Sequence, residues 1–557
     1  MASSSSFRLR SQEPEITAES IELKSPVTYT VSDDPDCKDS PENESPVHGD
    51  LELWGDTEHD LRDMKRLGKK QEFQRNFTFW SALGFVSVYM ATWEFVLVSL
   101  SVGFANGGFA GLFWCFLTTV LCYSSIVASL AEMASMFTGR KSQCCVDWVS
   151  EFAPPEYQRI LSYASGWMST LGWLASVAGS NFVLTTQIEA MVNIMRPSFA
   201  FENWQYVLLM VAFVTITILF NTWGAKALPT LETTSLIGHL VGFFIVLIPL
   251  WVLCPKNDAS EVFSSFEWQG GWSPGPGYLV SQVTVMYCNL GSDSVVHISE
   301  EVEDASVTVP RCMWYSYIGN VLMGIVMLVT MLFCIGPLED VIDSDVPYLL
   351  LFNNTGSTTL SVILNVILFV LIYAGNITAL ATCAREMWAF ARDRGLPFSS
   401  WIGKMNTHWN IPFHSVYATS AACILLSFIN FGSTLAFNIV VSVSLLGLLS
   451  TYMISIGCVL LKRIRGEPLP PARWSLGRYG ILVNTFGFVY SGVIIVFSCF
   501  PSYLPVDAAS ANYGPLIWVA VMVIAVIVYV VHGKRHYTAP VQFVEGRKAA
   551  GVGFQSS

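Results

Sequence analysis

Twelve long apolar segments are the feature that most constrains how this chain can fold. We place them near residues 78–103, 109–136, 160–191, 205–222, 233–253, 277–298, 312–335, 358–382, 413–430, 435–461, 480–500 and 514–532. Each is long enough to cross about 30 Å of hydrocarbon as a helix. The composition agrees, because 52% of the residues are hydrophobic and only 13% are charged. The sequence therefore predicts an all-α polytopic protein with twelve transmembrane helices in a lipid bilayer.

Acidic residues are concentrated at the N-terminus. Residues 1–60 hold 15 acids and 4 bases, which leaves 27 acids and 26 bases for the rest of a chain whose net charge is −12. We expect residues 1–70 to form a disordered cytoplasmic tail, residues 71–540 the membrane domain and residues 541–557 a second cytoplasmic tail. Lys24 and Lys38 in the first tail are candidate modification sites for regulated turnover, although a simple solvated tail is the commoner explanation. Trafficking machinery is a candidate partner of this tail. No part of the chain has the basic character of a nucleic-acid partner.

Basic residues predict the orientation. With the N-terminus inside, the outer loops receive only Arg196 and Lys256, whereas the cytoplasmic flanks receive most other bases. This bias predicts a multi-pass protein, which we place in the plasma membrane, with both termini cytoplasmic. The loop 337–357 then lies outside, and its sequon Asn353-Asn354-Thr355 predicts glycosylation at Asn353.

The sixth segment has a poor helix interior at its centre. Gly277 to Cys288 is typical of half a membrane helix, and the run Asn289-Leu290-Gly291-Ser292-Asp293 follows it. Gly exposes the backbone, while Asn, Ser and Asp compete for its hydrogen bonds. An acid at membrane depth is costly and indicates a functional site. Asp293 could also simply cap the second half of the helix, because Asp is a favoured N-cap.

The first segment carries a second acid at comparable depth. Its middle reads Tyr89-Met90-Ala91-Thr92-Trp93-Glu94 and lacks Gly or Pro. Transporters built from inverted repeats break the corresponding helix in each half. The halves would be residues 78–253 and 277–461, with residues 480–532 forming helices 11 and 12.

Four motifs resemble a known family. SLAEMASM (129–136), WVSEFAPPEYQRILSY (148–163), HISEEVEDASVTVPR (297–311) and FARDRGLPFSSW (390–401) are similar to fungal amino acid/choline permeases. These belong to the amino acid–polyamine–organocation superfamily, in which GABA and choline permeases are relatives. The resemblance spans about residues 72–540. It implies a five-plus-five inverted-repeat (LeuT-like) fold with the site at the breaks of helices 1 and 6. One departure is the stretch 137–148, FTGRKSQCCVDW, where such permeases usually carry a Gly pair.

These features predict a secondary transporter of a small amine or amino acid, such as an amino acid, GABA, choline or polyamine-like solute, driven by protons. The expected substrate-binding residues are Tyr89, Met90, Ala91, Thr92, Trp93, Glu94, Asn289, Gly291, Ser292 and Asp293. His239, within the fifth segment, is the proton-coupling candidate, although a lone His there is more often a helix-contact residue.

Several alternatives remain. Export of a small basic metabolite and nutrient sensing without transport both fit the same sequence. An enzyme is not expected, since no nucleophile–base pair appears, and we expect no cofactor. We also expect no metal, because His297 with Glu300 and Glu301 offers a single His. The acids at 300–304 are expected to line a hydrated inner mouth or to pair with Arg385, Arg392 or Arg394.

Overall fold

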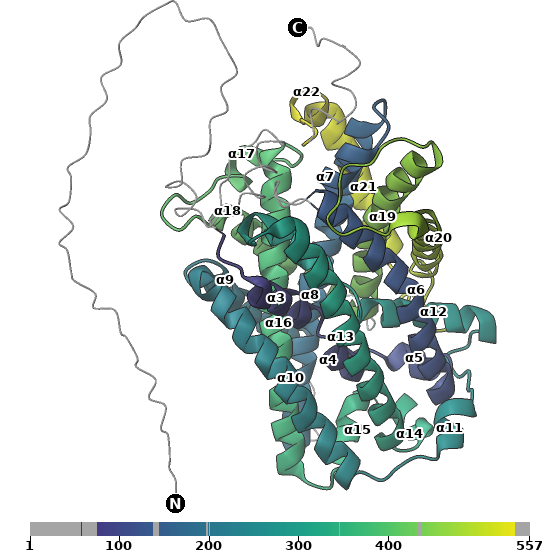
Figure 1. Cartoon of the computed structure of the whole chain (residues 1–557). Helices are drawn as coiled ribbons and strands as arrows, with labels where there is room; N and C mark the ends of the chain where they lie inside the picture. The colour runs from purple at the N-terminus through teal and green to yellow at the C-terminus, as the bar shows by residue number, and fades with distance from the viewer. Residues whose placement is uncertain are drawn as a thin grey trace, which may run out of the picture. The chain divides into compact units, whose positions relative to one another are not determined.

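The computed structural model describes residues 57, 75–137, 144–196, 199, 201–344, 346–431 and 436–540 (Figure 1). Within these ranges the chain is helical, and its β structure is limited to two isolated bridges, Phe77 with Val302 and Asn406 with Ile411. The predicted tails lie outside the described residues, apart from Thr57. So do residues 138–143 of the atypical stretch 137–148, whereas Phe137 and the helix α7 (Cys144–Phe152) are described.

Nine helical stretches in the described ranges are long and apolar enough to cross a membrane. They are Phe79–Ala105, Gly108–Met136, Asn203–Asn221, Ala225–Leu253, Ala305–Cys334, Thr358–Arg392, Ala436–Ile464, Gly477–Phe497 and Gly514–His536. In Figure 1 they contain α3 to α5, α6, α9, α10, α13, α16, α19, α20, and α21 with α22, respectively. The chain is therefore a polytopic membrane protein.

The other three predicted segments form helices of different character. Segment 160–191 lies in α8 (Gln158–Met195), which is long but carries many small and hydroxyl residues. Segment 277–298 is divided between α12 (Pro274–Tyr287) and the 3₁₀ helix η2 (Ser294–Glu301). Segment 413–430 forms the short helix α18 (Phe413–Ser427) and the turn η3 (Phe428–Phe431).

Shorter helices gather at two ends of the membrane domain. Figure 1 places α7, α17 (Ser399–Ile402) and α22 (Lys534–His536) at one end, which we call the α17 end. The helices α11 (Ala259–Ser264), α14 (Leu338–Ile342) and α15 (Pro347–Asn353) lie at the other, the α15 end.

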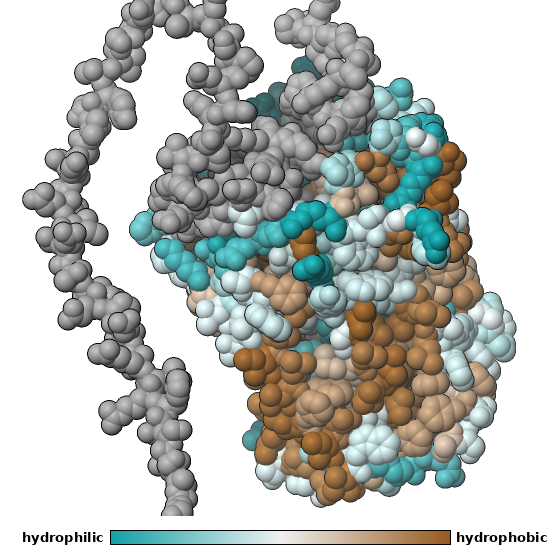
Figure 2. Space-filling view, viewed as in Figure 1, coloured by the Kyte–Doolittle hydropathy of each residue, from teal (hydrophilic) through white to brown (hydrophobic). Residues whose placement is uncertain are grey.

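Large apolar side chains cover much of the exterior. On α10 (Leu228–Leu253), Ile237, Leu240, Phe244 and Ile248 are all exposed. Figure 2 shows such residues gathered in a broad hydrophobic area with hydrophilic residues above and below it. A surface of this kind is stable against lipid tails and would aggregate in water, so it is the lipid-facing surface.

Glycines bring the core helices into close contact. A Cβ added at Gly447 on α19 (Ala436–Ile464) would lie 2.7 Å from the Cα of Gly172 on α8. A Cβ at Gly84 on α3 (Phe79–Met90) would lie 2.5 Å from the carbonyl oxygen of Glu232 on α10. Small residues at membrane helix contacts let backbones approach in this way.

Two predicted segment boundaries were wrong. In both cases a charged residue that lies inside a helix was placed outside the segment. The eighth segment was ended at residue 382, but α16 (Thr358–Arg392) continues, so Arg385 and Glu386 are buried in a helix rather than beginning a loop. The fifth was begun at residue 233, but α10 starts at Leu228 and includes the buried Glu232. Hydropathy places a boundary at the first charge, whereas a paired charge stays inside the protein.

Candidate functional site

The first membrane helix is interrupted at Ala91. Helix α3 ends at Met90, α4 (Thr92–Val98) begins one residue later, and Ala91 between them has φ 41° and ψ 42°. This left-handed conformation costs a residue with a Cβ about 1–2 kcal/mol. The interruption lies within the run 89–94 where the sequence suggested one, although no Gly or Pro produces it.

The sixth membrane helix is interrupted over six residues. Helix α12 ends at Tyr287 and η2 starts at Ser294, while Gly291 between them has φ 101°. Short turns replace the helix here, since the N–H of Asn289 donates to Met286 O at 3.0 Å and that of Ser294 to Gly291 O at 3.0 Å. The run from Asn289 to Asp293, predicted to be a poor helix former, is thus the segment that is not helical.

The two interruptions lie against each other. A Cβ added at Gly291 would fall 1.8 Å from Cε1 of the Tyr89 ring, so only a glycine allows this approach. The Tyr89 hydroxyl donates to Ser176 Oγ on α8 at 3.1 Å, and Ser176 is 3.1 Å from Ser444 Oγ on α19. Residues from both halves of the chain therefore converge at one place in the core.

Asp293 is fully buried beside the second interruption. Its Oδ1 accepts a hydrogen bond from the Tyr452 hydroxyl on α19 at 2.7 Å. Although Asp293 stands at the N-cap position of η2, its side chain makes no capping hydrogen bond. The alternative that it merely caps the second half of the helix was therefore wrong.

Glu94 and His239 form a buried pair. His239 Nδ1 on α10 and Glu94 Oε1 on α4 are 2.6 Å apart, and each side chain is 1% exposed. The Trp93 ring lies 6.0 Å from the imidazole and 5.9 Å from Phe243. Glu94 and His239, predicted for different roles, thus belong to one unit.

Buried polar atoms from both interruptions lack a hydrogen-bond partner among the described residues. They are Thr92 Oγ1, Glu94 Oε2 and Asn289 Oδ1, to which His239 Nε2 adds a fourth. Buried polar groups are nearly always paired, so such atoms need an explanation. Atoms of this kind are suited to receive a polar solute.

The remaining predicted residues complete the same region. Met90, Ala91 and Ser292 are buried in it. The N–H of Thr92, at the start of the half-helix α4, donates to Asn320 Oδ1 on α13 (Ala305–Cys334) at 3.1 Å.

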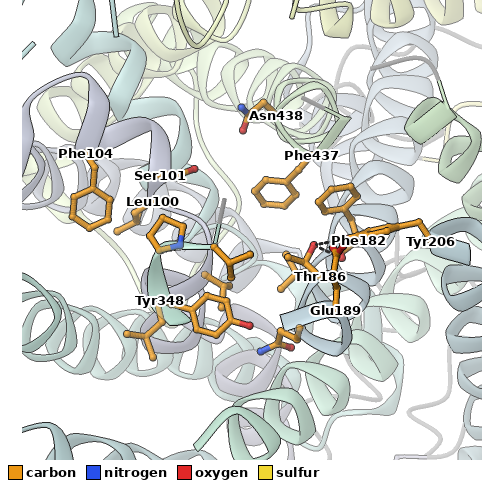
Figure 3. Close-up of a pocket in the computed structure, with 16 residues that line it drawn as sticks. Leu100, Ser101, Phe104, Phe182, Thr186, Glu189, Tyr206, Tyr348, Phe437 and Asn438 are labelled. Atoms are coloured by element: carbon orange, nitrogen blue, oxygen red, sulfur yellow. Dashed lines mark hydrogen bonds between the residues drawn. The ribbon is translucent and has the colours of Figure 1, made fainter. Parts of the chain in front are cut away.

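A cavity of about 310 Å³ lies outside this region. It is lined from α4, α8, α15 and α19, and Figure 3 shows Phe182, Thr186 and Glu189 facing Tyr348 and Phe437. None of the predicted substrate-binding residues lines it. An aromatic row connects it to the second interruption, because the Phe437 ring lies 5.6 Å from Phe182 and 5.8 Å from Tyr287.

Ion pairs close the α17 end. Arg385 Nε and Nη2 donate to the two carboxylate oxygens of Glu301 at 2.5 and 3.0 Å, and Arg392 Nη2 donates to Glu300 at 3.3 Å. The expected pairing of this acidic run with Arg385 and Arg392 is confirmed. His297 is fully buried, and its Nδ1 lies 3.1 Å from Glu386 Oε2.

Backbone pairing joins the same region to the first helix. The N–H of Asn76 donates to Glu301 O at 2.9 Å, and that of Glu303 donates to Phe77 O at 3.1 Å. The start of helix 1 is thus tied to the end of the interrupted sixth helix.

Sequence reasoning missed Tyr452, Asn320 and Glu232. Tyr452 and Asn320 carry no charge, and single polar residues are common in membrane helices, so no signal distinguished them. Glu232 could have been found as an acid beside an apolar run, had the segment been started a turn earlier.

The interrupted helices and buried acids within a lipid-facing surface are typical of a multi-pass membrane transporter. Residues 77–528 match the model of the amino acid permease family, and the chain belongs to this family.

Three fungal relatives are similar over most of their length. A putative amino acid/polyamine transporter of Macrophomina phaseolina is 28% identical over 77% of this chain and 96% of the relative. An uncharacterised amino-acid permease of Schizosaccharomyces pombe is 27% identical over 88% and 91%, respectively. The choline transporter of Saccharomyces cerevisiae is 25% identical over 84% and 83%.

Proposed function

We propose that the chain is a proton-coupled secondary transporter that carries a small amino acid or amine by alternating access around the two helix interruptions. The observation that carries the proposal is the contact of Gly291 with Tyr89, which joins the interruptions and brings Asp293, Glu94 and unpartnered polar atoms into one region. The names of the relatives support the solute class.

The architecture proposed is twelve spans in a five-plus-five inverted repeat. The nine long apolar helices, together with α8, α12 with η2, and α18, account for the twelve segments. Spans 1 and 6, which open the proposed halves 78–253 and 277–461, are the two that are interrupted in mid-membrane. The α17 end is proposed as cytoplasmic, with both termini on that side in the plasma membrane, because it receives the bases.

The solute is proposed to bind between the interruptions. Its ammonium or quaternary nitrogen would meet Asp293 and the rings of Tyr89, Trp93 and Tyr287. Thr92 and Asn289 supply polar atoms for the remainder, together with the backbone of Gly291 and Ser292. A carboxylate would need to displace Asn320 from the Thr92 amide, which favours solutes whose cationic group dominates recognition.

The proton is proposed to act at the Glu94–His239 pair. Both groups are titratable, they share one hydrogen bond, and Trp93 places them beside the first interruption. A proton bound by this pair would raise its net charge by one, and so would change what the neighbouring site binds.

The 310 Å³ cavity is proposed as the entry from outside, since α15 contributes to its lining and Phe437 connects it to Tyr287.

Reconstituted transport tests the function. Purified protein in proteoliposomes would be given radiolabelled GABA, choline, glutamine, arginine and spermidine, with an inward proton gradient, a sodium gradient or neither. We expect accumulation of at least one solute with the proton gradient, abolished by a protonophore. Accumulation that follows sodium and ignores the protonophore would overturn the coupling. Binding without flux would identify a sensor, and extrusion alone an exporter.

A further inference from the structure

We propose that Glu232 is a second proton-binding site of this transporter, placed between the Glu94–His239 pair and the Arg385–Glu301 pair at the α17 end. The inference rests on the proposed function and adds to it a residue that sequence reasoning did not identify.

Glu232 is a buried carboxyl group with one hydrogen bond. The side chain is 1% exposed, and its Oε1 accepts from the Thr378 hydroxyl on α16 at 2.7 Å. The other oxygen, Oε2, has no partner in the described part of the chain. An unpaired carboxylate is costly in a low-dielectric interior, and a bound proton removes that cost.

Among the described residues, no Lys, Arg or His forms an ion pair with this carboxyl group. Of the elements packed against α10, α3 carries no acid or base, and the one charged residue of α13, Arg311, is exposed. On α16, the guanidinium of Arg385 interacts electrostatically with Glu232 without contacting it. Its hydrogen bonds are made to Glu301. On the preceding turn Lys226 is exposed and lies over the ring of Trp409. Two further buried groups on these helices can exchange a proton: His239 on α10 and Glu386 on α16, which lies 3.1 Å from His297.

The register of α10 and α16 places Glu232 between the Glu94–His239 pair and the Arg385–Glu301 pair. The helices are antiparallel, because Glu232 meets Thr378 while Gly242 meets Leu371, where an added Cβ would be 2.8 Å away. His239 is seven residues from Glu232 along α10, about 10 Å at 1.5 Å per residue. Arg385 is seven residues from Thr378 along α16, about 10 Å in the opposite direction.

The backbone of Glu232 lies at a contact with the first half-helix. Gly84 on α3 lies directly on the Glu232 backbone carbonyl, and α3 continues to the interruption at Ala91. Movement of α3 during transport would therefore change what surrounds Glu232. A proton taken up at Oε2 would form one O–H bond and later leave to water at the α17 end, and no other bond would change.

The test separates coupling from transport itself. Glu232→Gln keeps the shape and the acceptor for Thr378 but cannot exchange a proton. In proteoliposomes supplied with the five radiolabelled solutes named above, proton-driven accumulation is expected to fall at least tenfold. Exchange of labelled for unlabelled solute, with no proton gradient, should stay within about twofold of wild type. A pH-sensitive dye trapped in the vesicles should report fewer protons per solute.

Controls make the outcome decisive. Glu467→Gln, which removes a carboxylate that is 43% exposed, should leave both assays unchanged. Parallel loss of exchange and accumulation in Glu232→Gln, or wild-type accumulation, would overturn the inference while leaving the function standing. If the wild type moves solute without protons, the proposed function itself fails.

A second variant covers the case in which Glu232→Gln does not reach the membrane. Glu232→Asp keeps the carboxyl group but withdraws it from Thr378. It should shift the pH profile of accumulation with exchange intact, and an unchanged profile would overturn the proposal.

Discussion

His239 and Glu94, which are 145 positions apart in the sequence, meet in the core with His239 Nδ1 2.6 Å from Glu94 Oε1. Each side chain is 1% exposed, so bulk water does not reach either group. Removing one member of such a buried pair leaves the other without its partner. We therefore expect the two residues to act as one unit.

Replacing either member of this pair should flatten the dependence of transport on external pH. Wild-type uptake is expected to rise as the outside becomes more acidic, because the inward proton gradient grows. Glu94→Gln retains a hydrogen bond to His239 but removes one of the two titratable groups, so the rise should flatten. Initial uptake rates across external pH, at matched surface expression, measure this. His239→Ala with an unaltered pH profile would clear His239 of the role.

Asp293→Asn should weaken apparent solute affinity about ten- to a hundred-fold. A hydrogen bond to a charged group contributes about 1.5–3 kcal/mol, and 1.4 kcal/mol corresponds to one decade. Tyr452→Phe is the matched control, because it removes only the hydrogen bond that Tyr452 donates to Asp293. Uptake saturation curves decide the role. If the two variants weaken affinity equally and the double mutant shows no further loss, Asp293 acts only by positioning Tyr452 and does not contact the solute.

Gly291→Ala should abolish transport, because the new methyl group would overlap the Tyr89 ring in a backbone conformation that L-residues avoid. Gly466→Ala is the control, since Gly466 also has a positive φ of 67° but nothing within 4 Å. It should show only the small cost of backbone strain. Uptake and folded yield of the two variants, measured side by side, test the contact. Normal transport by Gly291→Ala would show that the interruptions need not touch.

Breaking the Arg385–Glu301 pair should destabilise the protein strongly. Glu301→Gln leaves Arg385, a residue 4% exposed, without its carboxylate partner. Such losses cost about 3–5 kcal/mol. The exposed pair Arg465–Glu467, at 3.7 Å, provides the comparison, and Arg465→Gln should cost at most about 1 kcal/mol. Thermal unfolding midpoints in detergent measure both. Similar midpoints for the two variants would contradict the structural role of the buried pair.

Asn353→Gln should remove a glycan if the α15 end faces outside. Asn353 is exposed at the end of α15, which leaves its amide accessible. Glycosidase treatment should increase the gel mobility of the wild type and leave the variant unaffected. Epitope tags on both termini should be protected in intact cells. A tag accessible from outside would reverse the proposed orientation.

The sequence by itself determined the class of protein and much of the location of the site. Twelve segments of sufficient apolar length leave a helical membrane protein as the consistent fold, because lipid offers no partner for backbone groups. The run from Asn289 to Asp293 identified the interruption of the sixth helix through its poor helix formers. In the first helix, the buried acid Glu94 indicated the helical turn in which the interruption lies. Ala91 itself, a good helix former, gave no sign of it.

Only the tertiary structure decided which polar residues act together. A membrane helix that is apolar all round has no amphipathic period, so its sequence does not show which face meets which neighbour. The pairings of Glu94 with His239, Asp293 with Tyr452 and Glu301 with Arg385 join distant segments. Each depends on helix rotation and on close approaches such as that of Gly291 to Tyr89. Glu232 is a further example. In the sequence this acid marks the boundary of an apolar segment, but in the structure it is buried and accepts a hydrogen bond from the Thr378 hydroxyl on another helix.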